Sequence, residues 1–352
     1  MKISFYPNSV LDWPNPFWRI LKKELEKQDV KVIKMPFTFF DLLKNRNRVK
    51  VINFHYARPE VQGQLKKILP KKAWYLIYRF SCWFQKKTFR VKLNLAKKLG
   101  YKIIYTVHNL IPHNKNRNKI NKYIKSLLDI SDSIVTMGKS DKKKIEERYP
   151  DKKIDIIPHF HFKGSYKNNI SKKEAKKRLN IPHKKFTYLF FGHLRKYKGI
   201  DKLIKIFKKT GLDAFLLIAG NSSQEPDYVD KLKRLSEEDN RIIIKDKKIS
   251  YDKIQIYMNA ADIVVFPFKQ ISNSGSLLLA KSFYKPTICM DKGNLKEYIK
   301  KDTDTLVKDD KELKKAVIRS MKTKFPKSKK EYLKGIPSPE EVAKEYLNVY
   351  KK

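Results

Sequence analysis

Residues 190–207 read FFGHLRKYKGIDKLIKIF, and this stretch decides the fold of the chain. It begins as the end of an apolar strand, breaks at Gly192, and continues from Gly199 with apolar residues at helical spacing. Two cations, Arg195 and Lys198, stand in the loop between strand and helix, which we expect to be exposed. The glycine lets backbone approach a ligand, and a helix N-terminus adds free N–H groups and a positive dipole end. The pattern suits an anion, although an ordinary strand–turn–helix with solvated cations is the commoner use of such residues.

The composition indicates two globular domains with a strong affinity for anions. The chain has 352 residues, 41% of them hydrophobic, and a net charge of +45. Residues 1–165 carry about +24 and residues 166–352 about +21, so no single tail explains the charge. Such a charge attracts nucleic acid, an anionic bilayer or phosphorylated substrates. Residues 61–128 contain no Asp or Glu at all.

Cysteine usage and apolar runs bear on the compartment. Cys82 and Cys289 lie far apart and indicate neither a disulfide framework nor a metal site. The opening residues 1–10 read as a strand and a loop, not as a signal peptide, and no apolar run is long enough to cross a bilayer. We expect a cytoplasmic protein that is peripheral at the inner face of the cell membrane.

Strands and helices alternate twice along the chain, which predicts two doubly wound α/β domains facing each other across a cleft. The expected domains are residues 1–165, residues 166–335, and a C-terminal helix in 336–352 that packs back across the hinge. The expected strands of the first half are residues 2–6, 30–33, 49–54, 103–107, 132–137 and 154–157. Those of the second half are residues 186–191, 215–219, 241–244, 263–267 and 287–290. Asn15, Ser140, Ser171 and Ser338 are the expected helix caps.

Residues 71–98 form one long predicted helix whose role has two interpretations. Ala73, Ile77, Phe80, Phe84, Thr88, Val91 and Leu95 recur at helical spacing. Basic residues mixed with Trp and Tyr on the adjoining face resemble a helix that lies at a membrane interface. A core helix with a solvated basic face fits the same residues equally well.

His108 and His113 follow the predicted strand 103–107. Ligands of open parallel sheets bind beyond the carboxyl ends of the strands, which makes both histidines candidates for a site. A structural histidine is as common in such a position.

Four segments together carry a family resemblance: residues 191–199 (FGHLRKYKG), 106–113 (TVHNLIPH), 260–267 (AADIVVFP) and the Lys285-Pro286 pair. In this order and spacing they resemble glycosyltransferases of the two-Rossmann-domain (GT-B) fold, close to family 4 and its bacterial exopolysaccharide and capsule branch. The resemblance covers nearly the whole chain. It implies a hexosyltransferase that moves sugar from a nucleotide-diphosphate sugar to a saccharide acceptor, one we expect to be lipid-linked.

The resemblance also implies roles for particular residues. Arg195 and Lys198 would hold the donor's diphosphate, and Gly192 and Asn221 would line the donor cleft. Ile249 would lie beside the nucleotide base. His108 would sit at the reacting sugar, with His113 orienting it or touching the acceptor.

One departure from the family pattern concerns the donor loop. The family commonly has two Glu residues where this chain has Ile271 and Leu279. Ser274, Gly275 and Ser276 stand between them, and their N–H and hydroxyl groups could bind phosphate, although a plain turn and helix cap fits as well. This departure leaves both a retaining reaction without a side-chain base and an inverting one with a histidine base open.

The family uses no divalent metal ion and no further cofactor for this step. The only Asp-x-Asp in the chain, residues 302–304, is therefore expected to be a solvated turn. Two rival functions remain: an inactive glycosyltransferase-like subunit that anchors a partner enzyme, and a nucleic-acid-binding protein, for which no recognisable basic module is present. An active enzyme could also work as a homo-oligomer or beside a partner glycosyltransferase.

Overall fold

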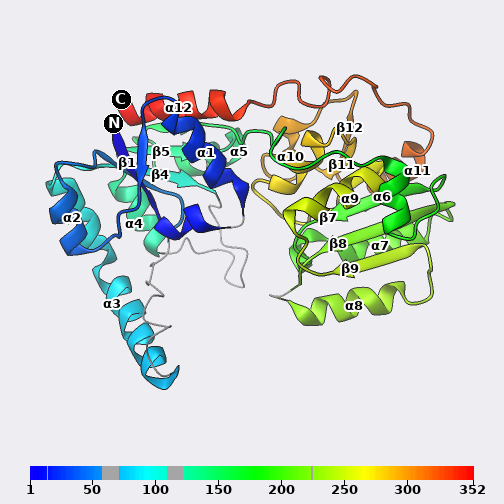
Figure 1. Ribbon diagram of the computed structural model, residues 1–352, viewed down its shortest axis with the longest axis horizontal. Helices are drawn as coiled ribbons and strands as arrows, with labels where there is room; N and C mark the ends of the chain where they lie inside the picture. The colour runs from blue at the N-terminus through cyan, green and yellow to red at the C-terminus, as the bar shows by residue number, and fades with distance from the viewer. Residues whose placement is uncertain (14, 58–70, 109–121, 223–224) are drawn as a thin grey trace. The chain divides into compact units, whose positions relative to one another are not determined.

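Two compact units, each with its own parallel six-stranded sheet, make up the chain (Figure 1). The computed structural model describes residues 1–13, 15–57, 71–108, 122–222 and 225–352. The first unit comprises Met1–Pro158 and Ser338–Lys352, and the second comprises His159–Pro337. Helices cover both faces of each sheet, which confirms the predicted α/β class with two doubly wound sheets. The placement of the C-terminal helix across a hinge stays a prediction.

The sheet of the first unit has the strand order β2-β1-β3-β4-β5-β6. Its strands are β1 (Lys2–Tyr6), β2 (Lys31–Ile33), β3 (Val51–Phe54), β4 (Lys102–Val107), β5 (Ser133–Thr136) and β6 (Ile154–Ile156). Its helices are α1 (Pro16–Glu26), α2 (Phe39–Asn45), α3 (Lys71–Lys98), α4 (Lys122–Ile130), α5 (Lys139–Glu146) and α12 (Pro339–Lys351), with the short 3-10 helix η1 (Asn8–Asp12). Both faces of such a sheet are covered, so its strands are apolar almost throughout.

The sheet of the second unit has the order β12-β11-β10-β7-β8-β9. Its strands are β7 (Phe186–Phe191), β8 (Ala214–Gly220), β9 (Ile242–Asp246), β10 (Ile263–Phe266), β11 (Thr287–Met290) and β12 (Asp304–Val307). Its helices are α6 (Lys172–Arg178), α7 (Ile200–Lys208), α8 (Pro226–Ser236), α9 (Ile254–Ala260), α10 (Gly275–Ser282) and α11 (Asp310–Ser320), with 3-10 helices η3 (Lys196–Lys198), η4 (Tyr251–Lys253) and η5 (Leu295–Tyr298).

Local side-chain chemistry sets most of the helix starts. The Asn15 side chain accepts from the Phe17 N–H at 3.0 Å, and Ser338 forms a reciprocal capping box with Glu341. Ser171 likewise accepts from the backbone N–H three residues on. These three predicted caps are confirmed. The cap predicted at Ser140 is wrong, because α5 begins one residue earlier and Gly138 takes the cap position without a side-chain bond.

Asp304 contradicts the expectation of a solvated turn. It begins β12, a strand that the sequence did not reveal, and its side chain is fully buried in an ion pair with Lys281 of α10. Its other carboxylate oxygen accepts from the Thr287 hydroxyl at 2.6 Å. The partners come from α10 and β11, so the aspartate is satisfied inside the unit rather than by water.

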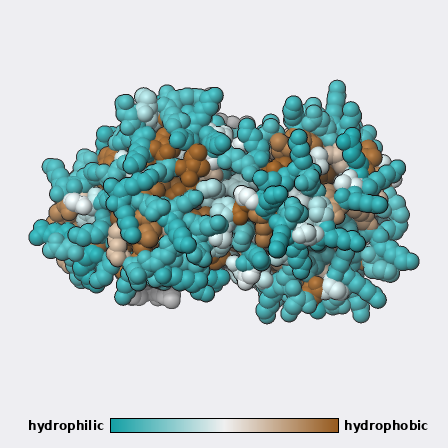
Figure 2. All heavy atoms as spheres, turned by 90° about the horizontal axis from the view of Figure 1, so that it is seen from above, coloured by the Kyte–Doolittle hydropathy of each residue, from teal (hydrophilic) through white to brown (hydrophobic). Residues whose placement is uncertain are grey.

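The described surface is strongly polar, as the composition requires, but several large hydrophobic residues are exposed on α2 and α3. On the face shown in Figure 2, hydrophobic residues form only small separate groups. The first half of α3 extends away from the sheet (Figure 1), and Phe80 and Phe84 are 64% and 43% exposed. Phe89 and Leu93 are the buried residues instead. The predicted stripe is therefore not the core face of α3. The core face is the adjacent one.

Candidate functional site

The carboxyl edge of the second sheet is a topological switch point. From the central strand β7 the chain continues to β8 and β9 on one side, whereas β10 and β11 lie on the other. Open α/β sheets bind ligands at such a point, because the connections leave in opposite directions and open a crevice between them. Gly192, Asn221 and Ile249 follow β7, β8 and β9, so three predicted site residues stand along this one edge.

Two glycines allow the loops at this edge to approach closely. A Cβ on Gly220 would lie 1.7 Å from the backbone oxygen of Gly192, and the Leu194 N–H donates to the Asn221 carbonyl at 3.0 Å. Gly192 has a φ of +139°, and a Cβ on it would lie 2.9 Å from the Ser276 hydroxyl. The structure therefore brings the loop after β7 against the start of α10. These were separate motifs in the sequence.

Lys198 is buried, with 7% of its surface exposed, which corrects the expectation that it lies in an exposed loop. Its Nζ stands 4.1 Å from the centre of the Phe268 ring, beyond the end of β10. Gly199 has a φ of +69° and lies against the backbone of Pro267. A Cβ on Gly199 would lie 2.1 Å from the Pro267 backbone oxygen, so the turn needs glycine at this position. Burial and the neighbouring half-buried Arg195 lower the pKa of Lys198 to about 7. A diphosphate would supply the counter-charge for these two cations.

Ser274, Gly275 and Ser276, the three small residues predicted to bind phosphate, have different roles at the start of α10. Ser274 is the helix cap, and its Oγ accepts from the Leu277 N–H at 3.2 Å, which leaves that oxygen committed to the helix. Gly275 is exposed and Ser276 is half-buried, so the first-turn N–H groups and the Ser276 hydroxyl remain the available donors. Ile271 and Leu279, which stand where the family commonly has Glu, are buried, with 7% and 5% of their surface exposed.

In the first unit, His108 stands at the carboxyl edge of the sheet beside a second histidine. His55 follows β3 as His108 follows β4, and His55 Nδ1 lies 3.3 Å from His108 Nε2. The Tyr56 ring stacks on His108 with 5.1 Å between centroids. His113 lies outside the described residues. His55 escaped notice in the sequence, although the rule that singled out His108, a histidine directly after a buried strand, applies equally to it.

A buried polar chain from α12 supports this edge. The Tyr346 hydroxyl donates to the Thr106 hydroxyl at 3.5 Å, and Thr106 donates to Asn53 Oδ1 at 2.9 Å. Asn53 in turn donates to the Tyr350 hydroxyl at 2.8 Å. Both tyrosines come from the C-terminal helix, which therefore fixes the strands that carry the two histidines.

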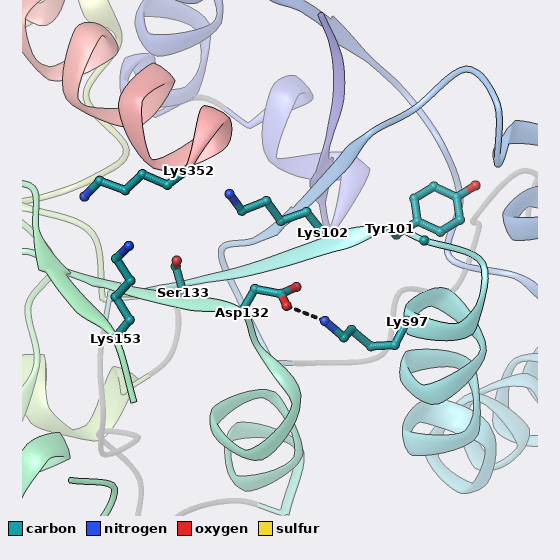
Figure 3. Close-up of a pocket in the computed structure, with 8 residues that line it drawn as sticks. Lys97, Tyr101, Lys102, Asp132, Ser133, Lys153 and Lys352 are labelled. Atoms are coloured by element: carbon teal, nitrogen blue, oxygen red, sulfur yellow. Dashed lines mark hydrogen bonds and ion pairs between the residues drawn. The ribbon is translucent and has the colours of Figure 1, made fainter. Parts of the chain in front are cut away.

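A basic hollow of about 370 Å³ in the first unit does not belong to this site (Figure 3). It lies at the amino edge of the sheet, where β4 and β5 begin, whereas the histidines stand at the carboxyl edge. Three of the four lysines that line it already have protein partners. Lys97 pairs with Asp132, Lys102 donates to the Val349 carbonyl at 3.0 Å, and Lys352 pairs with Asp155.

Comparison with known proteins agrees with this geometry. Residues 171–334 match the family model described as Glycosyl transferases group 1, and this range contains the residues of the second unit that the sequence predicts to bind a donor. A GDP-mannose:glycolipid 4-beta-D-mannosyltransferase from Xanthomonas campestris pv. campestris is 26% identical over 199 residues, 56% of this chain and 52% of that protein. The chain spans about half the length of the curated relatives it matches.

Solved structures of GT-B glycosyltransferases share the fold over nearly the whole chain. Sucrose-phosphate synthase from Thermosynechococcus elongatus has a TM-score of 0.71 at 16% identity, covering 96% of this chain and 93% of that one. Anabaena HepE in complex with UDP has a TM-score of 0.72 at 11% identity, with 100% of both chains covered. These structures confirm the predicted GT-B fold, and the family match supports the same assignment for the second unit.

Proposed function

We propose that this protein transfers a sugar from a nucleoside-diphosphate sugar to a hydroxyl group of a saccharide acceptor. One observation carries the proposal: buried Lys198, half-buried Arg195 and the first turn of α10 belong to loops that meet around Gly192, at the switch point of the second sheet. Two cations and a helix start at such a point match a diphosphate in charge and hydrogen-bonding capacity.

The same arrangement suits the chemistry of glycosyl transfer. Negative charge grows on the diphosphate as the bond to the sugar breaks, so donors already in place lower the barrier. In this proposal Arg195, Lys198 and the Ser276 N–H and hydroxyl stabilise the leaving group without a metal ion. Asn221 and Ile249, along the same edge, would contact the nucleoside, and His108 would contact the donor sugar.

The proposed acceptor is a lipid-linked saccharide of cell-surface or exopolysaccharide synthesis. The mannosyltransferase relative acts on a glycolipid, and α3 supplies a surface suited to a bilayer. Phe80, Trp83 and Phe84 are exposed there, and the Phe80 and Trp83 rings stack at 5.9 Å. Exposed Lys87 and Arg90 stand one and two turns further on. Aromatic rings enter the headgroup region while cations contact anionic lipids, so we propose that α3 attaches the protein peripherally to an anionic membrane.

No helix among the described residues is both long and apolar enough to cross a bilayer. Attachment through α3 would therefore be peripheral in the part of the chain that the structure describes.

A screen of nucleotide sugars tests the proposal. UDP-glucose, GDP-mannose and related donors are added singly, with thermal shift and release of nucleoside diphosphate as readouts. At least one nucleotide sugar should stabilise the protein and be turned over. Arg195→Ala should slow this turnover by raising its activation free energy by about 2–4 kcal/mol. Stabilisation without turnover, with or without acceptor extracts, would favour the inactive partner subunit. Binding of DNA that no nucleotide sugar displaces would favour the nucleic-acid binder.

A further inference from the structure

His55 lies in a closed aromatic pocket behind His108. It is 1% exposed, with the Trp18 ring at 4.5 Å and the Phe5 ring at 4.7 Å between centroids. The Tyr346 ring of α12 closes the pocket at 6.5 Å. Among the described residues, the His55 ring makes one polar contact, the 3.3 Å approach of its Nδ1 to His108 Nε2. The other ring nitrogen, Nε2, is buried without a hydrogen-bond partner.

This environment decides where the protons of the pair lie. Burial, and to a lesser extent His108, lower the pKa of His55 well below its ordinary value, so the His55 ring is neutral and carries one proton. If that proton were on Nε2, a buried N–H would have no acceptor. Orphaned buried N–H groups are rarer in proteins than under-satisfied acceptors. The proton therefore belongs on Nδ1, the nitrogen that faces His108.

We propose that His55 is a positioning residue that donates its Nδ1 proton to His108 Nε2 and so holds His108 in the tautomer with its own proton on Nδ1. The inference rests on the proposed function only in placing His108 at the donor sugar. His108 then offers that sugar a hydrogen-bond donor, and its acceptor nitrogen is occupied. A neutral His108 held in this way cannot take a proton from the acceptor hydroxyl through Nε2. The sequence left open whether His108 acts as a base or only contacts the reacting sugar. The proposed tautomer makes His108 a hydrogen-bond donor to the sugar and not a base.

The direct experiment is ¹⁵N NMR of the histidine rings in the full-length protein. The chain has seven histidines, and a His108→Gln variant assigns the His108 signals. In the wild type we expect His108 to carry its proton on Nδ1, with Nε2 unprotonated. His55→Asn places an amide donor near the original Nδ1 and should preserve this tautomer. His55→Leu fills a similar volume without a donor and should release His108 to the Nε2-protonated tautomer that free histidine prefers.

Kinetics with UDP-glucose or GDP-mannose, whichever is turned over, give the second readout. His55→Leu should lower kcat about tenfold, the effect of one lost hydrogen bond, with the KM for the donor nearly unchanged. His55→Asn should restore most of it. A wild-type proton on His108 Nε2, or the same His108 tautomer with His55→Leu, overturns the inference. If His55→Leu does not fold, the wild-type and His55→Asn spectra decide alone. Full turnover by His108→Gln would instead overturn the placement of His108 at the sugar and leave the tautomer result standing.

Discussion

Replacing Lys198 by Met should make nucleotide binding insensitive to pH. In the free protein, burial and Arg195 lower the pKa of Lys198 to about 7 from its ordinary 10.5. The difference corresponds to about 5 kcal/mol in favour of the neutral amine. In the proposed site a bound diphosphate would supply the missing counter-charge and favour the ammonium, so nucleotide binding and proton binding at Lys198 would be coupled.

The size of the coupling follows from the charged fraction. If UDP binds only the protein with charged Lys198, the apparent Kd rises about tenfold for each pH unit above 7. The second phosphate pKa of a phosphorylated group is about 6, so the diphosphate of the nucleotide does not titrate between pH 7.5 and 9.

Isothermal titration calorimetry with UDP over this range measures both effects. Repeating each titration in EPPS and in Tris, two buffers that differ in ionisation enthalpy, shows whether binding takes up a proton. The wild type should take up close to one proton at pH 8.5, and Lys198→Met should bind weakly, with a Kd independent of pH. A wild-type Kd that stays constant from pH 7.5 to 9, without proton uptake, would refute the coupling of Lys198 to the diphosphate.

The same substitution has a predictable effect on stability. Between pH 7 and 10.5 the unfolded chain holds a proton on Lys198 that the folded protein lacks, so this residue makes wild-type stability rise with pH in that window. Its unfavourable contribution is fully present below pH 7. Lys198→Met should therefore raise the free energy of unfolding at pH 6, by at most about 5 kcal/mol, and its advantage should vanish by pH 10.5. Chemical denaturation at the two pH values measures this.

Three further substitutions test other parts of the structure. Gly220→Ala should weaken UDP binding and lower the Tm, because its Cβ would lie 1.7 Å from the backbone oxygen of the loop after β7. Lys281→Ala should cost about 3–5 kcal/mol in denaturant unfolding, because it leaves Asp304 buried and unpaired, whereas a double apolar replacement of the pair should cost much less. Trp83→Ser should reduce binding to vesicles with anionic lipid. The control Phe40→Ser changes an exposed aromatic residue on α2 and should not reduce this binding. Equal losses in the two variants would show that α3 is not the attachment surface.

Apolar runs in the sequence were enough to predict the two-sheet fold and eleven of the twelve strands found among the described residues. The strand that was not predicted, β12, begins with the charged residue Asp304, which is buried in an ion pair with Lys281 of α10. Because the two residues are far apart in the sequence, their pairing leaves no local sequence pattern. The sequence left the role of the apolar stripe on α3 open for a related reason. Periodicity shows that an apolar stripe exists but not whether a partner covers it, and Phe80 has none of the core packing that Phe89 has.

The candidate site was predictable in its parts but not in its environment. Gly192 and Ser276 belong to separate motifs, and only the fold shows that a Cβ on one would touch the hydroxyl of the other. The sequence marks Lys198 as a cation in a loop. Its burial depends on Phe268, which the strand order brings beneath it from beyond β10.

Transfer of labelled sugar tests the central claim most directly. The protein is incubated with UDP-[¹⁴C]glucose or GDP-[¹⁴C]mannose and a lipid extract of bacterial membranes, and label is counted in the organic phase. We expect wild-type protein to move label from one such nucleotide sugar into lipid, and both Arg195→Ala and Lys198→Met to lose most of this transfer while remaining folded. Undiminished transfer by both folded variants, or none by the wild type from any nucleotide sugar or lipid extract tried, would contradict the assignment of this site to a sugar donor's diphosphate.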